Sequence, residues 1–424
     1  MNITNRPKTL LILVISIAIA VVVGLMSFGI ANQTRAPSRT LALGLYPQGW
    51  AKAAFAQDRY SSLQARDPAA LPGRALSDLA RDALAQEPLA VAAIPVVSAE
   101  LGLGNQRAAS AAILQLGARI SRRNTALNNR LIALYLSRGD EAAAILALGR
   151  AVAISNDARS SYMRQLAAAT TRPGAGEALA PLLGRKPQWA SNYWNEVLQL
   201  GPAIEEGGKL RLALTEQPWN DRTATPTDLQ LVEKLASFDK FDLGSALADR
   251  LGLNEPSGSE VLVNGTFNRQ PRLAPFDWQL ITTGEFGAVI NPRDRTMLIS
   301  SLPQAAGVAA RQLVQAPDGS YRFSWTLRGN VTAESTPLRF RLRCAQGSSA
   351  SAAPVAMRTG SGSALVTLPK PACRWYWAQL EIDTQQSSSG VDLILKSLRL
   401  ESIGPANREI VREQDPSELL RQKR

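Results

Sequence analysis

The hydrophobic pattern of the chain changes its period near residue 260. From about residue 74 to residue 253, apolar residues recur every three or four positions, as in "RAASAAILQLGARI" (107–120). After residue 260, runs such as "YRFSWTLRG" (321–329) alternate apolar and polar positions. An amphipathic helix needs the first period and a half-buried strand needs the second. The sequence therefore predicts an all-α domain followed by an all-β domain.

A long apolar stretch lies near the N-terminus. No residue between Thr9 and Thr34 is charged, and the apolar part, Leu10–Ile30, has the length of one membrane-spanning helix, about 20 residues. A cleaved signal peptide is the alternative, because "GIA" before Asn32 has the small residues of a cleavage site. The apolar region of a signal peptide is usually shorter, about 7–15 residues. We therefore expect an uncleaved transmembrane anchor over residues 10–31.

The two cysteines bear on the orientation of that anchor. Basic residues on its two sides are nearly balanced, so the positive-inside rule does not decide the orientation. Cys344 and Cys373 lie 29 positions apart in the β region, which suits a disulfide between strands and an oxidising compartment. Two unrelated buried thiols are the alternative. Abundant Ala, and Arg in excess of Lys, favour a bacterial source. We expect a single-pass protein of the bacterial inner membrane with most of its chain in the periplasm.

The absence of histidine removes much chemistry. With no histidine in 424 residues, neither a Ser-His-Asp nor a Cys-His nucleophile can form, nor can an imidazole metal site. The net charge is +12, but the basic residues are spread along the chain and no nucleic-acid-reading motif occurs. We expect no catalytic residue, no cofactor, no metal and no nucleic-acid partner.

One helical segment resembles a tetratricopeptide (TPR) repeat. Residues 124–157 match its length of 34, with Gly139 at the turn, and the same order recurs upstream at Gly104, Ala109, Ile113 and Leu116. The positions that pack the two helices are Leu131, Ile132, Tyr135, Ala144, Leu148 and Ala151. The resemblance implies a solenoid that offers a groove to a peptide or partner protein. A generic helical bundle is the alternative.

These patterns divide the chain into seven segments. About nine or ten strand-like runs after residue 260 predict a two-sheet β-sandwich of the jelly-roll type. Before them, a cap, a proline and an acid at Thr225, Pro226 and Asp228 predict the start of a late helix. The expected segments are a cytoplasmic tail (1–9), the anchor (10–31), a tether (32–73), a TPR-like helical domain (74–253), a linker (254–260), the sandwich (261–403) and a charged tail (404–424).

The entry to the sandwich, "LVNGTFNRQPRLAPFDWQL" (262–280), carries a second resemblance. Its Asn264, Gly265, Phe267 and Trp278 resemble the opening of carbohydrate-binding modules of the galactose-binding-like superfamily. Asn-Gly favours a sharp turn, and the resemblance implies that both aromatic side chains pack inward. Such modules often place an Asp of a structural calcium site in their last strand, where this chain has "LKSLRL" (395–400). We therefore expect no cation there.

Strand parity predicts a candidate ligand-binding face on the sandwich. In "PLRFRLRC" (337–344) and "RWYWAQLEID" (374–383), alternate residues point to opposite sides of the sheet. The side expected to face the core holds Leu338, Phe340, Leu342, Cys344, Tyr376, Ala378, Leu380 and Ile382. The expected outward side, a possible glycan-binding face, holds Arg339, Arg341, Arg343, Trp375, Trp377, Gln379 and Glu381. Cys373 shares its parity with the outward residues, so a disulfide to Cys344 needs a strand end or a bulge. Burial of both tryptophans is the alternative.

The combined pattern predicts a non-enzymatic, membrane-anchored periplasmic scaffold or binding protein. The architecture resembles that of membrane-anchored proteins in bacterial exopolysaccharide synthesis and export. The expected partners are other envelope or polysaccharide-machinery proteins and an acidic polysaccharide. The alternative is a polysaccharide-active glycosidase or lyase, which needs two carboxylates in a cleft. The acids of the β region show no such paired motif; they are Asp277, Glu285, Asp294, Asp318, Glu381, Asp383 and Asp392.

We predict that the chain fractionates with the inner membrane and resists extraction by carbonate or by high salt, because Leu10–Ile30 spans the bilayer. Membrane fractionation followed by N-terminal sequencing is the measurement. A soluble periplasmic form that begins at Asn32 would contradict the anchor.

Overall fold

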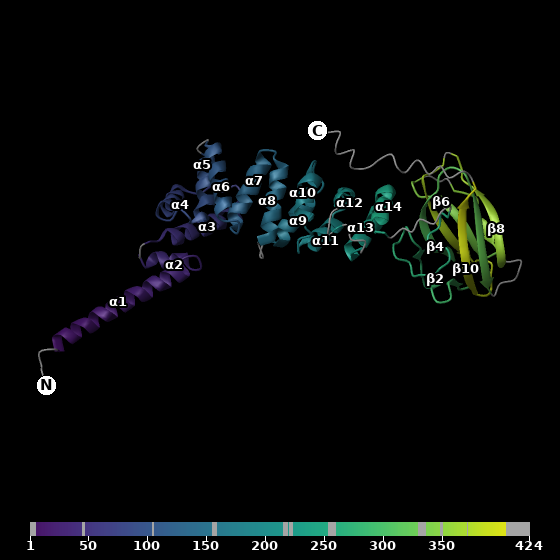
Figure 1. Cartoon of the computed structure of the whole chain (residues 1–424), viewed down its shortest axis with the longest axis horizontal. Coiled ribbons are helices and arrows are strands. Elements are labelled where there is room, and N and C mark those ends of the chain that lie inside the picture. Colours follow the sequence, from purple (N-terminus) through teal and green to yellow (C-terminus); the bar gives the residue numbers. More distant parts are fainter. Residues whose placement is uncertain are drawn as a thin grey trace. The chain divides into compact units, whose positions relative to one another are not determined.

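The computed structural model of the chain (Figure 1) describes ten stretches of residues. They are 6–44, 47–103, 106–154, 159–214, 219, 224–252, 260–329, 336–347, 351–370 and 372–403. Gly104 of the expected repeat, most of the expected linker and the expected charged tail lie outside these stretches. Contacts divide the chain into two compact units, Met1–Leu182 and Leu183–Arg424. The seven-segment division stays a prediction.

Helices come first in the chain and strands follow (Figure 1). Within the described stretches the helices are α1 (Arg6–Asn32), α2 (Pro37–Ala42), α3 (Gly49–Arg66), α4 (Arg74–Gln86), the 3-10 turn η2 (Val91–Ala93), α5 (Ile94–Leu103), α6 (Arg107–Ile120), α7 (Thr125–Ser137), α8 (Glu141–Ile154), α9 (Arg159–Ala169), α10 (Ala175–Leu183), α11 (Ala190–Gln199), α12 (Ala203–Ala213), α13 (Pro226–Ser237) and α14 (Phe241–Arg250).

Helix α1 is the one helix of the described stretches that is long and apolar enough to cross a membrane. The most apolar 18-residue window within Leu10–Asn32 has a mean hydropathy of 3.0, and none of that window is buried against the rest of the protein. An apolar helix without protein cover is unfavourable in water. The exposed side chains therefore agree with the expected anchor.

Residues 32–73, which the sequence indicated as a tether, contain helices α2 and α3. Small alanines, Ala53 and Ala56, lie on the buried face of α3 and let it pack closely on α4. Tyr60 is buried beside them, and its hydroxyl accepts a hydrogen bond from Arg130 of α7. This stretch is therefore part of the helical series.

Helices α7 and α8 form the helix pair that the repeat implied, but a repeating solenoid is not confirmed. Gly139 takes a positive φ of 71° at the turn between them. Upstream, the expected register is wrong, because Ala109 and Leu116 of α6 are exposed. Helix α6 instead buries the face that contains Gly117, where a Cβ atom would lie 2.8 Å from the side chain of Ile94. Close packing at this glycine sets the rotation of α6.

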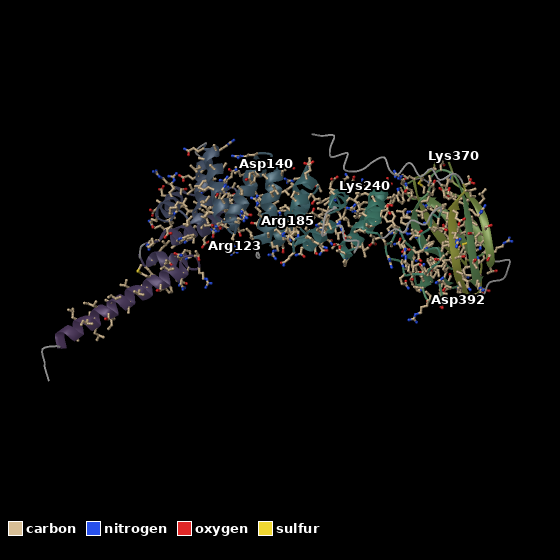
Figure 2. All side chains as sticks on the ribbon, viewed as in Figure 1. Arg123, Asp140, Arg185, Lys240, Lys370 and Asp392 are labelled. Carbon is tan, nitrogen blue, oxygen red and sulfur yellow. A yellow bond between two sulfur atoms is a disulfide. The ribbon has the colours of Figure 1, made fainter. Side chains whose placement is uncertain are left out.

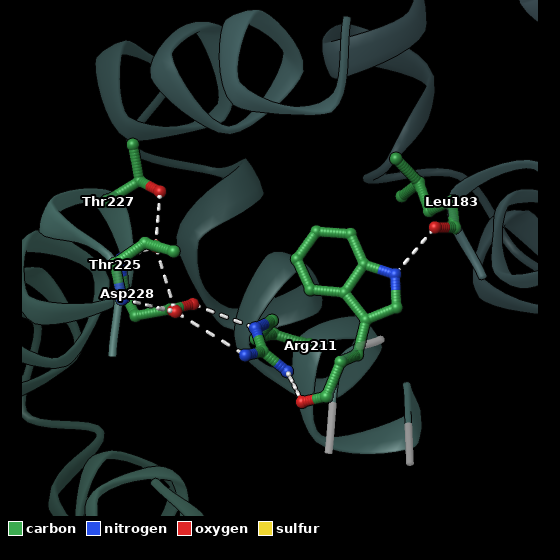
Figure 3. Close-up of polar contacts among 6 residues, drawn as sticks. Leu183, Arg211, Thr225, Thr227 and Asp228 are labelled. Atoms are coloured by element: carbon green, nitrogen blue, oxygen red, sulfur yellow. Dashed lines mark hydrogen bonds and ion pairs between the residues drawn. The ribbon is translucent and has the colours of Figure 1, made fainter. Parts of the chain in front are cut away.

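A buried ion pair holds the end of the helical region together (Figure 3). Arg211 of α12 donates from Nε to Asp228 Oδ1 over 2.7 Å, and both side chains are almost fully buried. Asp228 also completes the expected cap of α13, because its carboxylate accepts the backbone N–H of Thr225. The ring of Trp219 lies beside the guanidinium and donates a hydrogen bond to the carbonyl oxygen of Leu183. One carboxylate thus serves both a helix cap and a buried arginine.

The strands form two antiparallel five-stranded sheets packed face to face, as the sequence predicted. One sheet has the order β1-β4-β9-β6-β7 and the other the order β2-β3-β10-β5-β8. The strands are β1 (Gln279–Leu280), β2 (Phe286–Asn291), β3 (Thr296–Ser301), β4 (Ala306–Gln315), β5 (Ser320–Gly329), β6 (Leu338–Cys344), β7 (Val355–Met357), β8 (Gly360–Thr367), β9 (Trp375–Asp383) and β10 (Val391–Ser402). A single apolar core lies between the sheets.

The stretch around Asn264 attaches the entry of the sandwich to strand β10. Asn264 and Phe267 both take a positive φ of 54°. A Cβ atom on Gly265 would lie 2.1 Å from the carbonyl oxygen of Leu398, so glycine is required at this approach. Phe267 and Trp278 are buried in the core, which confirms their expected inward packing.

We predict that Asp228→Ala lowers the free energy of unfolding by about 3–5 kcal/mol, because it leaves Arg211 buried without its counter-charge. The matched control is Glu206→Ala, which removes the exposed partner of Lys209 and should cost at most about 1 kcal/mol. The urea midpoint, followed by circular dichroism, is the measurement. Equal shifts for the two variants would show that the buried pair has no special role.

Candidate functional site

A disulfide bridges the first sheet at the end where β9 begins. The Sγ atoms of Cys344 and Cys373 are bonded, and their Cα atoms are 5.7 Å apart. Cys344 is the last residue of β6, whereas Cys373 lies two residues before β9. The expected bridge is therefore confirmed, and a strand end resolves the mismatch in parity between the two cysteines.

Strand β9 separates its residues between the two faces of the sheet as the parity argument predicted. Tyr376, Ala378, Leu380 and Ile382 belong to the sandwich core, together with Leu338, Phe340, Leu342 and Cys344 of β6. The residues between them point to the opposite face. We call this surface the outer β9 face; it consists of Gln279, Arg311, Arg339, Arg341, Arg343, Trp375, Trp377, Gln379, Glu381 and Asp383.

Trp375 does not have the accessibility expected of a glycan-binding residue, because helix α14 covers it. Its side chain is 3% exposed, and its indole N–H donates a hydrogen bond to Asp242 of α14 over 2.8 Å. Phe241 of α14 and Phe276 of the entry loop pack against the same ring, at centroid distances of 6.0 and 5.7 Å. Trp375 is therefore a contact between the helices and the sandwich, as the alternative reading held for this residue.

The accessible part of the outer β9 face begins at Trp377, which is half-buried. The guanidinium of Arg311 on β4 lies over its ring, 4.3 Å from the centroid. Arg311 also donates from Nε to Gln279 Oε1 over 2.7 Å. Cross-strand pairing sets Gln379 between Arg311 and Arg341, and its side chain is only 6% exposed. The face thus combines one aromatic ring with amide and guanidinium groups.

Two arginines of this face are already paired with acids. Arg341 lies 3.3 Å from Glu381, and Arg339 lies 3.5 Å from Asp383. Both pairs are partly exposed, so each contributes little to stability. The face holds four arginines and two carboxylates, which leaves a surplus of two positive charges. Its electrostatic field favours an anionic ligand.

Sequence reasoning missed Arg311 and Gln279. Arg311 lies on β4, opposite Gln379 of β9, and Gln279 lies on β1, opposite Arg311. The signal was present in "VAARQLVQ" (308–315), where Arg311 is the one charged residue in a largely apolar run. A β-bulge between Val308 and Ala310 shifts the alternation of this strand, so parity alone did not assign Arg311 to a face.

The acids of the β region fall into three structural classes. Asp277 is buried, pairs with Arg269 and accepts two backbone N–H groups, so it supports the entry loop. Glu381 and Asp383 pair with arginines of the outer β9 face. The others, Glu285, Asp294, Asp318 and Asp392, are exposed. Glu285 and Asp392 border a shallow hollow of about 400 Å³ beside β2, β3 and β10. Asp392 lies at one end of the sandwich and Lys370 at the opposite end (Figure 2).

No protein-family profile matches the chain, and no curated protein matches its sequence. Among solved structures it is similar to the arabinose-bound MgGH51 α-L-arabinofuranosidase, with 16% identity, a TM-score of 0.26, and coverage of 36% of this chain and 27% of that chain. It is also similar to TmCBM61 in complex with β-1,4-galactotriose, with 13% identity, a TM-score of 0.24, and coverage of 34% and 99%. Similarities with TM-scores this low do not indicate a function.

We predict that replacing Cys344 and Cys373 together with Ala lowers the stability of the sandwich by about 3–4 kcal/mol, because the bridge closes a loop of about 30 residues. Hydrogen exchange should quicken in β6 and β9, and also in α14, because Arg374 and Trp375 next to the bridge both contact Asp242. Helices α3–α8 should exchange at an unchanged rate. Exchange that quickens equally in both compact units would contradict this prediction.

Proposed function

We propose that this chain is a membrane-anchored, non-enzymatic binding protein of the bacterial envelope, and that its outer β9 face binds a glycan. The observation that carries the proposal is the composition of the accessible part of that face. The aromatic ring of Trp377, the amide of Gln279 and four guanidinium groups lie there on neighbouring strands, with the guanidinium of Arg311 over the ring. Sugars present both C–H faces and hydroxyl groups, and such a surface can pack on the former and hydrogen-bond the latter.

The periplasmic location that we propose rests on two independent features. Helix α1 has the length and hydropathy to hold the chain in a bilayer. The Cys344–Cys373 disulfide requires an oxidising compartment for its formation. A periplasmic body on an inner-membrane anchor satisfies both requirements.

The helical region is the part that we propose to hold another protein of the envelope or of a polysaccharide-producing machinery. It exposes large apolar side chains, among them Leu103, Leu116 and Leu136. Exposed leucines are common singly, so they support the proposal only as candidate contacts. In this scheme the chain keeps a glycan near the proteins that make or export it.

The polysaccharide-active enzyme that the sequence left as an alternative gains no support from the placement of the acids. Glycoside hydrolysis needs two carboxyl groups flanking a glycosidic bond. Glu381 and Asp383, the acids of the outer β9 face, are each engaged by an arginine on β6. We therefore propose binding without turnover.

We predict that the full chain in nanodiscs binds an envelope polysaccharide and that Trp377→Ala weakens this binding by about 2 kcal/mol, roughly 30-fold, because a central aromatic contact is lost. Intrinsic fluorescence or calorimetry is the measurement.

The matched control is Phe286→Ala, which truncates a half-buried aromatic on β2 of the opposite sheet and should leave the affinity unchanged. Circular dichroism establishes that both variants are folded. Absence of binding to every acidic and neutral glycan at millimolar concentration would overturn the proposed function.

A further inference from the structure

Arg311 is the most buried cation of the outer β9 face that lacks an acid. Its side chain is half-buried between the ring of Trp377 and the amide of Gln279. Within the stretches that the structure describes, no carboxylate oxygen lies within 4.0 Å of it. Gln279 is neutral and Trp377 offers only the electrons of its ring, so neither supplies a full counter-charge.

A half-buried guanidinium without a counter-ion is an unfavourable arrangement. Burial removes water from the charge and lowers the pKa of Arg311 below its ordinary value. Proteins seldom bury a charge unless a partner compensates it. A planar guanidinium that has used only its Nε–H still offers its terminal N–H groups in the geometry that matches a carboxylate.

The neighbouring arginines differ in this respect. Arg339 and Arg341 already face Asp383 and Glu381, so their charges are largely neutralised within the face. Arg343 is exposed and, among the described residues, also has no acid within ion-pair distance. It is paired across the sheet with Trp377. The two uncompensated cations thus lie on β4 and β6, the two strands that flank Trp377 on β9.

We propose that the outer β9 face recognises the carboxylate groups of an acidic polysaccharide, and that Arg311, held on Trp377 by Gln279, is the residue that determines this specificity. The proposal rests on the glycan-binding function proposed above and names its ligand class. The sugar ring lies near Trp377, a carboxylate pairs with the terminal N–H groups of Arg311, and Arg343 attracts the neighbouring charge. Acidic polymers are thereby preferred over neutral polymers with the same backbone.

The test uses the full chain in nanodiscs and two probes with the same backbone: an oligogalacturonate and its carboxyl-reduced counterpart, in which each carboxylate is a neutral hydroxymethyl group. We predict that the wild-type protein prefers the acidic probe, and that Arg311→Gln weakens its binding by about tenfold to a hundredfold. Binding of the reduced probe should change less than about twofold. Arg322→Gln is the matched control, because it removes one positive charge from an exposed position on β5 of the opposite sheet, and it should leave the preference unchanged.

Each outcome separates the two proposals. Equal binding of the two probes would overturn the specificity but leave the glycan-binding function standing, whereas binding of neither would overturn the function. Tight binding of poly-glutamate would assign the face to acidic peptides instead. If Arg311→Gln loses its circular dichroism signal, Arg311→Lys tests the same residue: it keeps the charge but lacks the paired N–H groups of a guanidinium, and it should lose part of the preference for the acidic probe.

Discussion

Strand β9 is buried in the core on one face and partly covered on the other, and this double burial determines where a ligand can reach the sandwich. One face packs into the core along its whole length through Tyr376, Ala378 and the residues that follow. The opposite face is covered at its start, where Trp375 lies under α14, and is partly accessible at Trp377, Glu381 and Asp383. The disulfide at Cys373 fixes the point at which the strand enters the sheet. The groups of the outer β9 face lie on β9, on its neighbours β4 and β6, and on β1 beyond β4.

Two arginines with opposite roles illustrate how burial and partners separate structure from function. Arg211 is almost fully buried and is held by both oxygens of Asp228, so its charge is fully compensated inside the protein. Arg311 is half-buried and has an amide and an aromatic ring as neighbours. Removing the partner of the first destabilises the fold. Among the described residues the second has no carboxylate within ion-pair distance, which is why we propose that a ligand carboxylate pairs with it.

Local patterns in the sequence predicted the local features of the fold, and they failed where distant segments meet. Three features depend only on spacing within one segment, so the sequence predicted them. They are the cap at Thr225, the change of hydrophobic period near residue 260, and the side of β9 that faces the core. The rotation of α6 depends on close packing at Gly117 against other helices, which spacing does not reveal. Likewise, nothing near Trp375 in the sequence identifies Asp242, which lies 133 positions away.

The cover that α14 provides for Trp375 also bears on how this sandwich could be exchanged between proteins. A module that is recombined as a unit has to be soluble when cut out at its linker. Cutting between α14 and the sandwich would instead bring an indole ring and the adjoining Phe276 into water, next to an unbridged Arg374. Such a fragment exposes an apolar patch that promotes aggregation. Since α14 itself packs on α12 and α13, a soluble fragment that contains the sandwich has to keep these helices as well.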